Sequence, residues 1–153
     1  MTRGESVTFL KRYNDNVVEP AIASSNAVAF ASEGRTLDLS LEATTVLQLD
    51  ITAPTDGFII VNGNASIGAN GGIEVDCWIN IDDLEKTTAH GVSHAATGGP
   101  DDVYLDEWAD NIGFDVTAGD HTLYLVCQQM NGSDDESSVR PRRMTVVFSA
   151  NSL

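Results

Sequence analysis

Carboxylates are the most frequent chemically active groups in this chain of 153 residues, and many stand in adjacent pairs. Calcium takes about six to eight oxygen ligands, and loops that meet at one end of a β-sandwich can supply them. No stretch has the fixed spacing of an EF-hand loop, so the alternative is a solvated acidic rim. The candidate calcium ligands are Asp82, Asp83, Asp101, Asp102, Asp134 and Asp135.

His90 and His94 stand in "HGVSH", a spacing that on a helix directs both imidazoles to one metal ion. Gly91 and the neighbouring small residues disfavour a helix, so we expect solvent-exposed loop histidines. His121 precedes a predicted strand, and the sequence assigns it no special role.

Cys77 and Cys127 each fall on the predicted inward face of a strand. A disulfide needs Cα atoms about 4.4–6.8 Å apart, which the sequence does not fix. Two alternatives stay open: buried free thiols, and a disulfide across the core, which would imply an oxidising environment. Core residues flank both cysteines and no basic partner is evident, so neither is expected to be a nucleophile.

Trp78 and Trp108 are candidate glycan-binding residues. Trp78 falls on the outward face of its predicted strand, and Trp108 has acidic neighbours on both sides in "DEWAD". An exposed aromatic ring beside carboxylates and amides suits a sugar, whereas packing at a subunit contact or cover by a loop are the alternatives.

No residue pattern typical of an enzyme stands out. The stretches "GANGG" and "TGGP" lack the strand-to-helix context and the lysine of a phosphate-binding loop. Paired carboxylates are too common in this chain for any one pair to indicate hydrolytic chemistry. We therefore expect a protein that is not an enzyme and that has no cofactor other than a candidate calcium ion.

The net charge of the chain limits the kinds of molecule that it can bind. The chain carries 23 acidic against 8 basic residues, a net charge of -15, which argues against nucleic acid and membrane partners and indicates a soluble protein or a salty habitat. No apolar run approaches the roughly 20 residues of a membrane helix. The N-terminal stretch "MTRGESVTFLKRYNDN" lacks the apolar segment of a secretion signal. We therefore expect either a protein that is cytoplasmic when made, which fits a virion component, or an extracellular-surface protein exported by a route that the sequence does not show.

Apolar and polar residues alternate with a period of two in several segments, as expected for strands with one buried face. In "GIEVDCWINID", Ile73, Val75, Cys77, Ile79 and Ile81 share one face. Similar alternation covers residues 36–42, 46–52, 121–129 and 144–150, and turn formers such as "APTDG" and "NGSDDESS" lie between the segments. Helical periodicity is nearly absent.

These short, regularly separated strands predict an all-β domain, a two-sheet antiparallel jelly-roll β-sandwich of about eight to ten strands. Residues 26–153 are expected to form this sandwich. Residues 1–25 hold one short apolar run, Val7–Leu10, and are expected to form an N-terminal arm or edge segment. Residues 84–102 are expected to form a long loop or a weak edge strand.

One predicted strand is apolar on both faces. It contains Phe58, Ile59, Ile60 and Val61, after a break at Pro54 and Gly57. One face should fill the core, and the other needs a second covering. That covering is either another copy of the chain, or the N-terminal arm or the 84–102 segment of the same chain.

Four stretches together resemble the compact jelly roll of the complement-globular-head and tumour-necrosis-factor-like group, over roughly residues 36–150. They are "LDITAPTDGFIIVNGNASI", "IEVDCWINID", "FDVTAGDHTLYLVCQQ" and "RRMTVVFSA". Related variants are frequent in phage and bacterial surface proteins. The resemblance implies homotrimers in which side chains of central strands surround a threefold axis, and it makes Phe58, Ile59, Ile60 and Val61 expected interface residues.

The resemblance favours an exposed virion component that forms homotrimers, such as a capsid decoration or fibre-head protein attached to a capsid lattice. One alternative is a carbohydrate-binding, lectin-like module that uses Trp78 or Trp108 and a loop calcium. Another is an extracellular filament subunit whose N-terminal arm adds a strand to a neighbour's sheet. The basic residues Arg140, Arg142 and Arg143 are expected to pair with acidic loops of a neighbouring subunit or to protect a strand edge.

Overall fold

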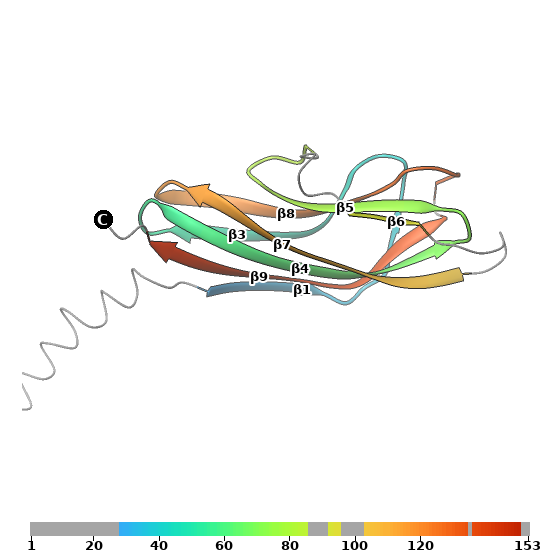
Figure 1. Cartoon of the computed structure of the whole chain (residues 1–153), viewed down its shortest axis with the longest axis horizontal. Helices are drawn as coiled ribbons and strands as arrows, with labels where there is room; N and C mark the ends of the chain where they lie inside the picture. The colour runs from blue at the N-terminus through green and yellow to red at the C-terminus, as the bar shows by residue number, and fades with distance from the viewer. Residues whose placement is uncertain (1–27, 86–91, 96–102, 135, 151–153) are drawn as a thin grey trace, which may run out of the picture.

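The computed structural model describes residues 28–85, 92–95, 103–134 and 136–150, which form nine β-strands in two antiparallel sheets (Figure 1). The all-β prediction is therefore confirmed. The strands are β1 (Val28–Glu33), β2 (Leu37–Leu39), β3 (Thr44–Ala53), β4 (Gly57–Asn70), β5 (Glu74–Ile81), β6 (Val92–Ala95), β7 (Val103–Val116), β8 (Gly119–Gln129) and β9 (Ser137–Ala150). Within these ranges, no helix is long and apolar enough to cross a membrane.

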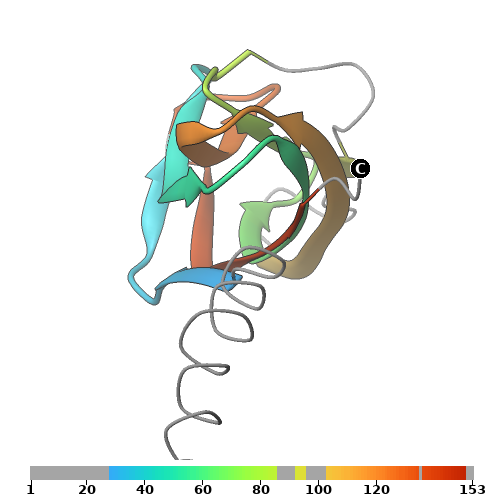
Figure 2. The ribbon, with the colours of Figure 1, turned by 90° about the vertical axis from the view of Figure 1, so that its left-hand side faces the viewer.

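The strand order is that of a jelly roll. Sheet A has the order β1-β9-β4-β7, with β2 also paired to β9, and sheet B has the order β3-β8-β5-β6. The antiparallel pairs are nested: β5 pairs with β6, β4 with β7, β3 with β8, and β2 with β9. Nested pairs of this kind arise when one long antiparallel ribbon wraps into two facing sheets. Viewed along the long axis, the two sheets enclose the core (Figure 2).

The core forms from alternate residues of both sheets, because successive side chains of a strand point to opposite faces. From sheet A it takes Ile59 and Val61 on β4, and from sheet B it takes Ile79 on β5 with Leu123 and Leu125 on β8; all five are fully buried. Burial of apolar surface, at about 25 cal/mol per Å², is the main term that stabilises such a sandwich. The apolar residues of the alternating segments predicted from the sequence lie on the inward faces of β3, β5, β8 and β9.

One segment differs from the expected strands, and another takes one of its two expected forms. The segment 36–42 is a strand only over Leu37–Leu39, and Leu41 is 44% exposed. The chain turns there because Ser40 Oγ bonds the backbone of Glu42 and Asp134 Oδ1 accepts the N–H of Leu41 at 3.0 Å. Within the segment 84–102, Val92–Ala95 forms β6 at the edge of sheet B, so the edge-strand alternative holds there. The predicted arm, residues 1–25, lies outside the described residues.

Pro141 lies inside β9, a strand with partners on both sides. The register against β4 shifts between Ala65 and Ile67, so that Arg140 and Pro141 face only Ser66. Proline has no N–H to donate, and in sheet interiors it is confined to bulges of this kind. On the other side of β9, pairing with β2 ends at Val139 and pairing with β1 begins at Arg142.

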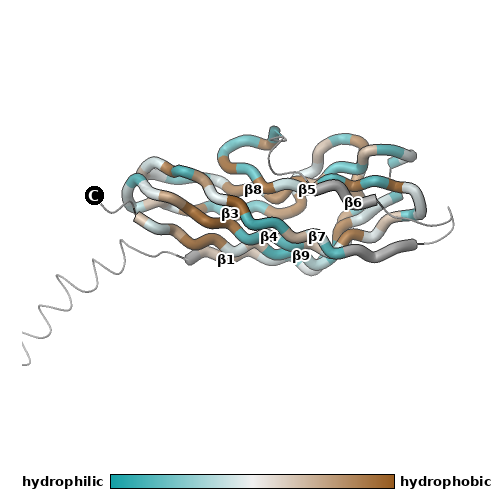
Figure 3. The backbone as a smooth tube through the Cα atoms, viewed as in Figure 1, coloured by the Kyte–Doolittle hydropathy of each residue, from teal (hydrophilic) through white to brown (hydrophobic). Residues whose placement is uncertain are grey.

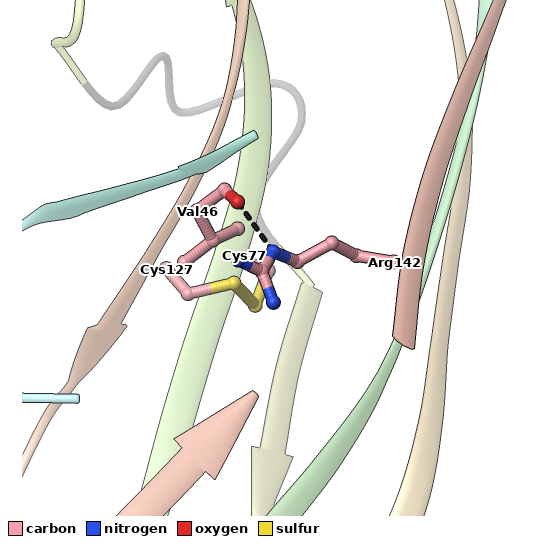
Figure 4. The surroundings of a disulfide bond; sticks show 4 residues. All are labelled: Val46, Cys77, Cys127 and Arg142. Carbon is pink, nitrogen blue, oxygen red and sulfur yellow. Dashed lines mark hydrogen bonds between the residues drawn. A yellow bond between two sulfur atoms is a disulfide. The ribbon is translucent and has the colours of Figure 1, made fainter. Parts of the chain in front are cut away.

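Cys77 on β5 and Cys127 on β8 are directly opposite each other in sheet B, and a disulfide joins them across a Cα–Cα distance of 4.1 Å (Figure 4). The structure therefore has the disulfide and not the free thiols. It does not have the expected geometry across the core, because both cysteines belong to one sheet.

Arg142 lies beside this disulfide, although it comes from β9 of the opposite sheet (Figure 4). Its Nε donates to the carbonyl of Val46, and its Nη1 donates to the carbonyl of Arg35 at 2.6 Å. Val46 stands where the β3–β8 register shifts, so the guanidinium satisfies a carbonyl at an irregular point of the ladder. Burial lowers the pKa of Arg142, and the charge of Glu33 partly offsets this. Arg142 is 5% exposed, so the expected pairing with a neighbouring subunit is wrong for this residue.

We predict that reduction of the disulfide lowers the free energy of unfolding by about 4 kcal/mol, because the bond closes a loop with a sequence separation of 50 residues in the unfolded chain. Denaturant unfolding with and without a thiol reductant measures the difference. In the Cys77→Ala/Cys127→Ala variant the reductant should change nothing. Superimposed curves for the oxidised and reduced native chain would contradict the prediction.

Candidate interface on the outward face of sheet A

The outward face of β4 exposes apolar side chains at the start of the strand. Phe58 is 37% and Ile60 is 42% exposed, whereas Ile59 and Val61 are fully buried in the core. In Figure 3 the tube of β4 changes from brown at its start to teal further along, where Asn62 and Asn64 follow. Of the four expected interface residues, only Phe58 and Ile60 are therefore accessible to another molecule.

Two further apolar residues extend this surface across sheet A. Val147 on β9 pairs with Ile60, and Phe30 on β1 pairs with Thr145, the outward neighbour of Val147. Phe30 is 59% and Val147 is 37% exposed. We call Phe30, Phe58, Ile60 and Val147 the apolar face. Sequence reasoning missed Phe30 and Val147, and the signal for Val147 was the unbroken apolar pair Val146-Val147 in "MTVVFSA".

Phe58 is held in place by a glycine on the next strand. A Cβ atom built on Gly113 of β7 would lie 2.1 Å from Cζ of Phe58, so the ring occupies the space above that glycine. Gly113 pairs with Ile60, the residue two positions from Phe58 on the same face. The absence of a side chain at position 113 thus lets the ring lie across β7 and remain part of a flat surface.

The outward face of the two central strands of sheet A carries little charge. Over the paired segments 58–64 and 143–149, its residues are Phe58, Ile60, Asn62 and Asn64 on β4, and Arg143, Thr145, Val147 and Ser149 on β9. Arg143 is the one charged residue among these eight. In a chain with a net charge of -15, copies of the chain repel one another, and these eight residues add no negative charge to that repulsion.

Both tryptophans are buried, which contradicts their expected role as exposed glycan platforms. Trp78 is 1% exposed; it points outward from β5, as predicted, but the segment after β5 covers it and the Leu84 carbonyl accepts its Nε1–H at 3.2 Å. Trp108 is fully buried because the alternation of β7 turns it inward, where its ring lies 3.2 Å from the place of a Cβ on Gly63.

The candidate calcium ligands do not converge within the described ranges. Asp82 Oδ1 accepts the N–H of Thr122 at 2.8 Å, Asp83 Oδ1 accepts the N–H of Glu85 at 3.0 Å, and Asp134 Oδ1 accepts the N–H of Leu41 at 3.0 Å. No group of three or more carboxylate, imidazole or thiol side chains that could hold an ion occurs among the residues described. Asp101, Asp102, Asp135 and His90 lie outside them, and His94 belongs to β6 rather than to a loop.

His121, for which the sequence predicts no special role, links the segment after β5 to β8. Its Nδ1 is 2.7 Å from Asp82 Oδ2, and its Nε2 is 2.9 Å from the carbonyl oxygen of Thr117. Both partners are acceptors, so the arrangement favours the imidazolium, which has two N–H donors. Asp82 itself has a φ of 56°, a left-handed conformation that its bonds to His121 and Thr122 stabilise.

The pKa values of the two groups move in opposite directions. The hydrogen bond to Asp82 contributes most to raising the pKa of His121, followed by the bond to Thr117, and burial opposes both; the charges of Asp82 and Asp120 add to the rise. Burial alone would raise the pKa of Asp82, but the bonds from His121 and from the N–H of Thr122 outweigh it and lower this pKa.

The fold has counterparts among proteins of virus particles. One chain from the structure of infectious bursal disease virus, Gx strain, matches with a TM-score of 0.53 at 14% identity, over 82% of this chain and 32% of that chain. A chain from the infectious bursal disease virus VP2 subviral particle matches with a TM-score of 0.50 at 15% identity, over 81% of this chain and 33% of that one. This chain thus spans about a third of each, and the likeness concerns the fold.

Sequence comparisons add nothing to this likeness. No protein-family model matches the chain, and no curated protein matches it. The family resemblance read from the sequence is therefore supported as far as a jelly roll shared with virus-particle proteins.

We predict that the His121–Asp82 contact makes stability depend on pH in two limbs. The raised pKa of His121 gives stability that is complete below its ordinary value of 6.5 and is lost as pH rises through the folded-state pKa. The lowered pKa of Asp82 gives stability that is complete above 3.8 and is lost as pH falls through the folded-state pKa. The contact should therefore contribute most between these two values.

The measurement is the free energy of unfolding of the native chain minus that of His121→Gln, taken from pH 3 to pH 9. The difference should be largest at mildly acidic pH and should shrink toward pH 9. Asp82→Asn serves as the matched variant: it should remove the acid limb and weaken the alkaline limb, since the Thr117 carbonyl and Asp120 still raise the pKa of His121. A difference that stays constant over the whole range would contradict the assignment.

Proposed function

We propose that this chain is a non-enzymatic structural protein of a virus particle, and that it assembles as a homotrimer through the apolar face of sheet A. The observation that carries the proposal is the apolar face itself, where four large side chains are exposed on adjacent strands β1, β9 and β4. Contiguous exposed apolar surface on a soluble domain marks an interaction site. The jelly-roll fold shared with virus-particle chains supports the particle as the setting.

Charge favours a second copy of this chain as the partner. Two copies with this net charge repel each other, and the eight outward residues named above on β4 and β9 combine apolar side chains with a single charged residue, which is basic. Interface centres are depleted of charge and enriched in aromatic residues, as Phe30 and Phe58 are here. Three copies that turn this face inward would cover it completely and leave their acidic surfaces in solvent.

Within a particle, the proposed role is that of an exposed component, such as a capsid decoration or fibre-head protein. A lectin-like role has less support, because Trp78 and Trp108, the aromatic side chains proposed to hold a sugar, are both buried. Loop calcium remains a separate proposal for Asp101, Asp102 and Asp135, which lie outside the described residues.

Ile60→Asp is predicted to convert the trimer into monomers, since it would place three carboxylates together in a water-excluded contact. Sedimentation velocity and light scattering at several concentrations give the oligomeric state. Ile60→Thr keeps a β-branched side chain in the strand, and it should weaken association by about tenfold without unfolding the domain.

The matched control is Leu41→Asp, because Leu41 is 44% exposed, close to the 42% of Ile60, and lies in the turn between β2 and β3. This variant should assemble like the native chain. Thermal unfolding of all variants checks that the fold is retained. A native chain that stays monomeric at all concentrations, or an Ile60→Asp variant that assembles normally, would refute the proposal.

A further inference from the structure

The edge of β7 that faces away from β4 is a second surface, and no strand among the described residues pairs with it. β7 is 14 residues long and lies at the end of sheet A, and in the part of the chain that the structure describes it pairs only with β4. Both edges of sheet A lie close to sheet B, since β7 contacts β5 and β6 just as β1 and β2 contact β3 and β8, but at the opposite edge the guanidinium of Arg142 also links Arg35 to Val46. An open strand edge presents backbone donors and acceptors that can bind an added strand.

The charge of the β7 side chains determines which kind of strand can pair with this edge. The strand has four acidic residues, Asp106, Glu107, Asp110 and Asp115, and no basic ones. Two copies of this edge would oppose carboxylates to carboxylates, which disfavours edge-to-edge pairing of the strand with itself. A strand that carries lysine or arginine would instead form cross-strand pairs of opposite charge.

Asp110 gives a separate indication of a cationic partner. It is on the inward side of β7, opposite Gly63, and its Oδ1 accepts the N–H of Asn111 at 2.8 Å. Its Oδ2 is buried and has no hydrogen-bond partner among the described residues. A strand added at this edge would bring a side chain beside Asp110, and a cation there would satisfy the oxygen.

We propose that this edge binds the N-terminal segment of a neighbouring copy, through residues 7–13 ("VTFLKRY"). Residues 1–13 carry three basic residues, Arg3, Lys11 and Arg12, against one acidic residue, Glu5, so their net charge is +2 in a chain of -15. The stretch 7–13 also combines β-branched, aromatic and apolar residues with adjacent basic ones. It is thus a complementary strand for the acidic edge.

A neighbour's edge is favoured over the chain's own edge, and this step rests on the proposed assembly. The segment leads into β1, which lies at the far side of sheet A from β7, with β9 and β4 between them. The chain's own β7 edge is thus on the other side of the apolar face, which the proposed trimer buries, whereas a neighbour can present its β7 edge directly to the segment. Exchange between neighbours is a head-to-tail contact, and such contacts close into rings when the rotation between copies permits.

A charge-swap experiment on the full chain tests this pairing. The arm variant is Lys11→Glu/Arg12→Glu, the edge variant is Glu107→Lys/Asp115→Lys, and a third variant carries all four changes. Each double variant alone should associate about tenfold more weakly than the native chain, and the fourfold variant should regain association. The control is Asp38→Lys/Glu42→Lys, which makes the same change of charge on exposed residues away from β7 and should leave association unchanged.

Mixing the two double variants separates neighbour exchange from pairing within one chain. In an equimolar mixture, each arm finds an oppositely charged edge on the other variant, so association should return on mixing. If the fourfold variant alone recovers and the mixture does not, the segment binds its own chain and the proposal is overturned. The proposal is also overturned if neither recovers while thermal unfolding shows intact domains.

To test the edge contact separately from the trimer contact, the charge-swap variants are also made in a chain that carries Ile60→Asp, and association is measured again. There, charge-swap effects that persist support edge pairing even if the apolar face plays no part. Conversely, loss of association with Ile60→Asp together with no effect of the charge changes would retain the trimer contact and reject the edge contact.

Discussion

The structure depends on β4, whose side chains alternate between the core and the outward face of sheet A while neighbouring strands fix its register. This strand pairs along its length with β7 on one side and β9 on the other, so its register is fixed on both edges. Ile59 and Val61 must point into the space between the sheets, where they meet the side chains of β5 and β8. Because successive side chains of a strand point to opposite faces, Phe58 and Ile60 must point outward. The apolar face is therefore a direct consequence of how the core is filled, and the apolar side chains at 58 and 60 are not needed by that core.

The sequence alone was sufficient for the fold class, since alternating segments separated by turn formers leave few arrangements other than an antiparallel sandwich. It was also sufficient for the outward direction of Trp78, which follows from its place between Cys77 and Ile79. It failed where a residue's surroundings come from a distant segment. Trp78 is covered by the backbone after β5, and neither its own strand nor its neighbours reveal that. For Trp108, the acidic residues beside it suggested exposure, but strand alternation decided its burial; Asp110, an acid on the same inward side, obscured the pattern.

Contacts between strands account for the other differences. Whether Cys77 and Cys127 meet depends on the register of β5 against β8, and whether Arg142 is buried depends on an irregular point of β3 in the other sheet. His121 found two acceptors because the turn after β5 places Asp82 opposite the start of β8. Each of these interactions joins residues far apart in the chain. They tie together the strands of sheet B, the two sheets, and the segment that covers Trp78, and none of them uses the outward side of sheet A.

The direction in which the chain enters and leaves the sandwich also has a consequence for display. Val28, where β1 starts, lies opposite Val147 near the end of β9, so both ends of the described domain are at the same pole as Gly57 and Val116. The turn after β4 and the connection between β8 and β9 are at the other pole, joined by the bonds of Asn131 to Gly72 and Glu74. If the domain is attached to a larger assembly through either terminus, the opposite pole, whose loops Asn131 links, would point away from that assembly. Sequence changes in the loops of that pole would then alter the surface available to other molecules without affecting the pole at which the domain is attached.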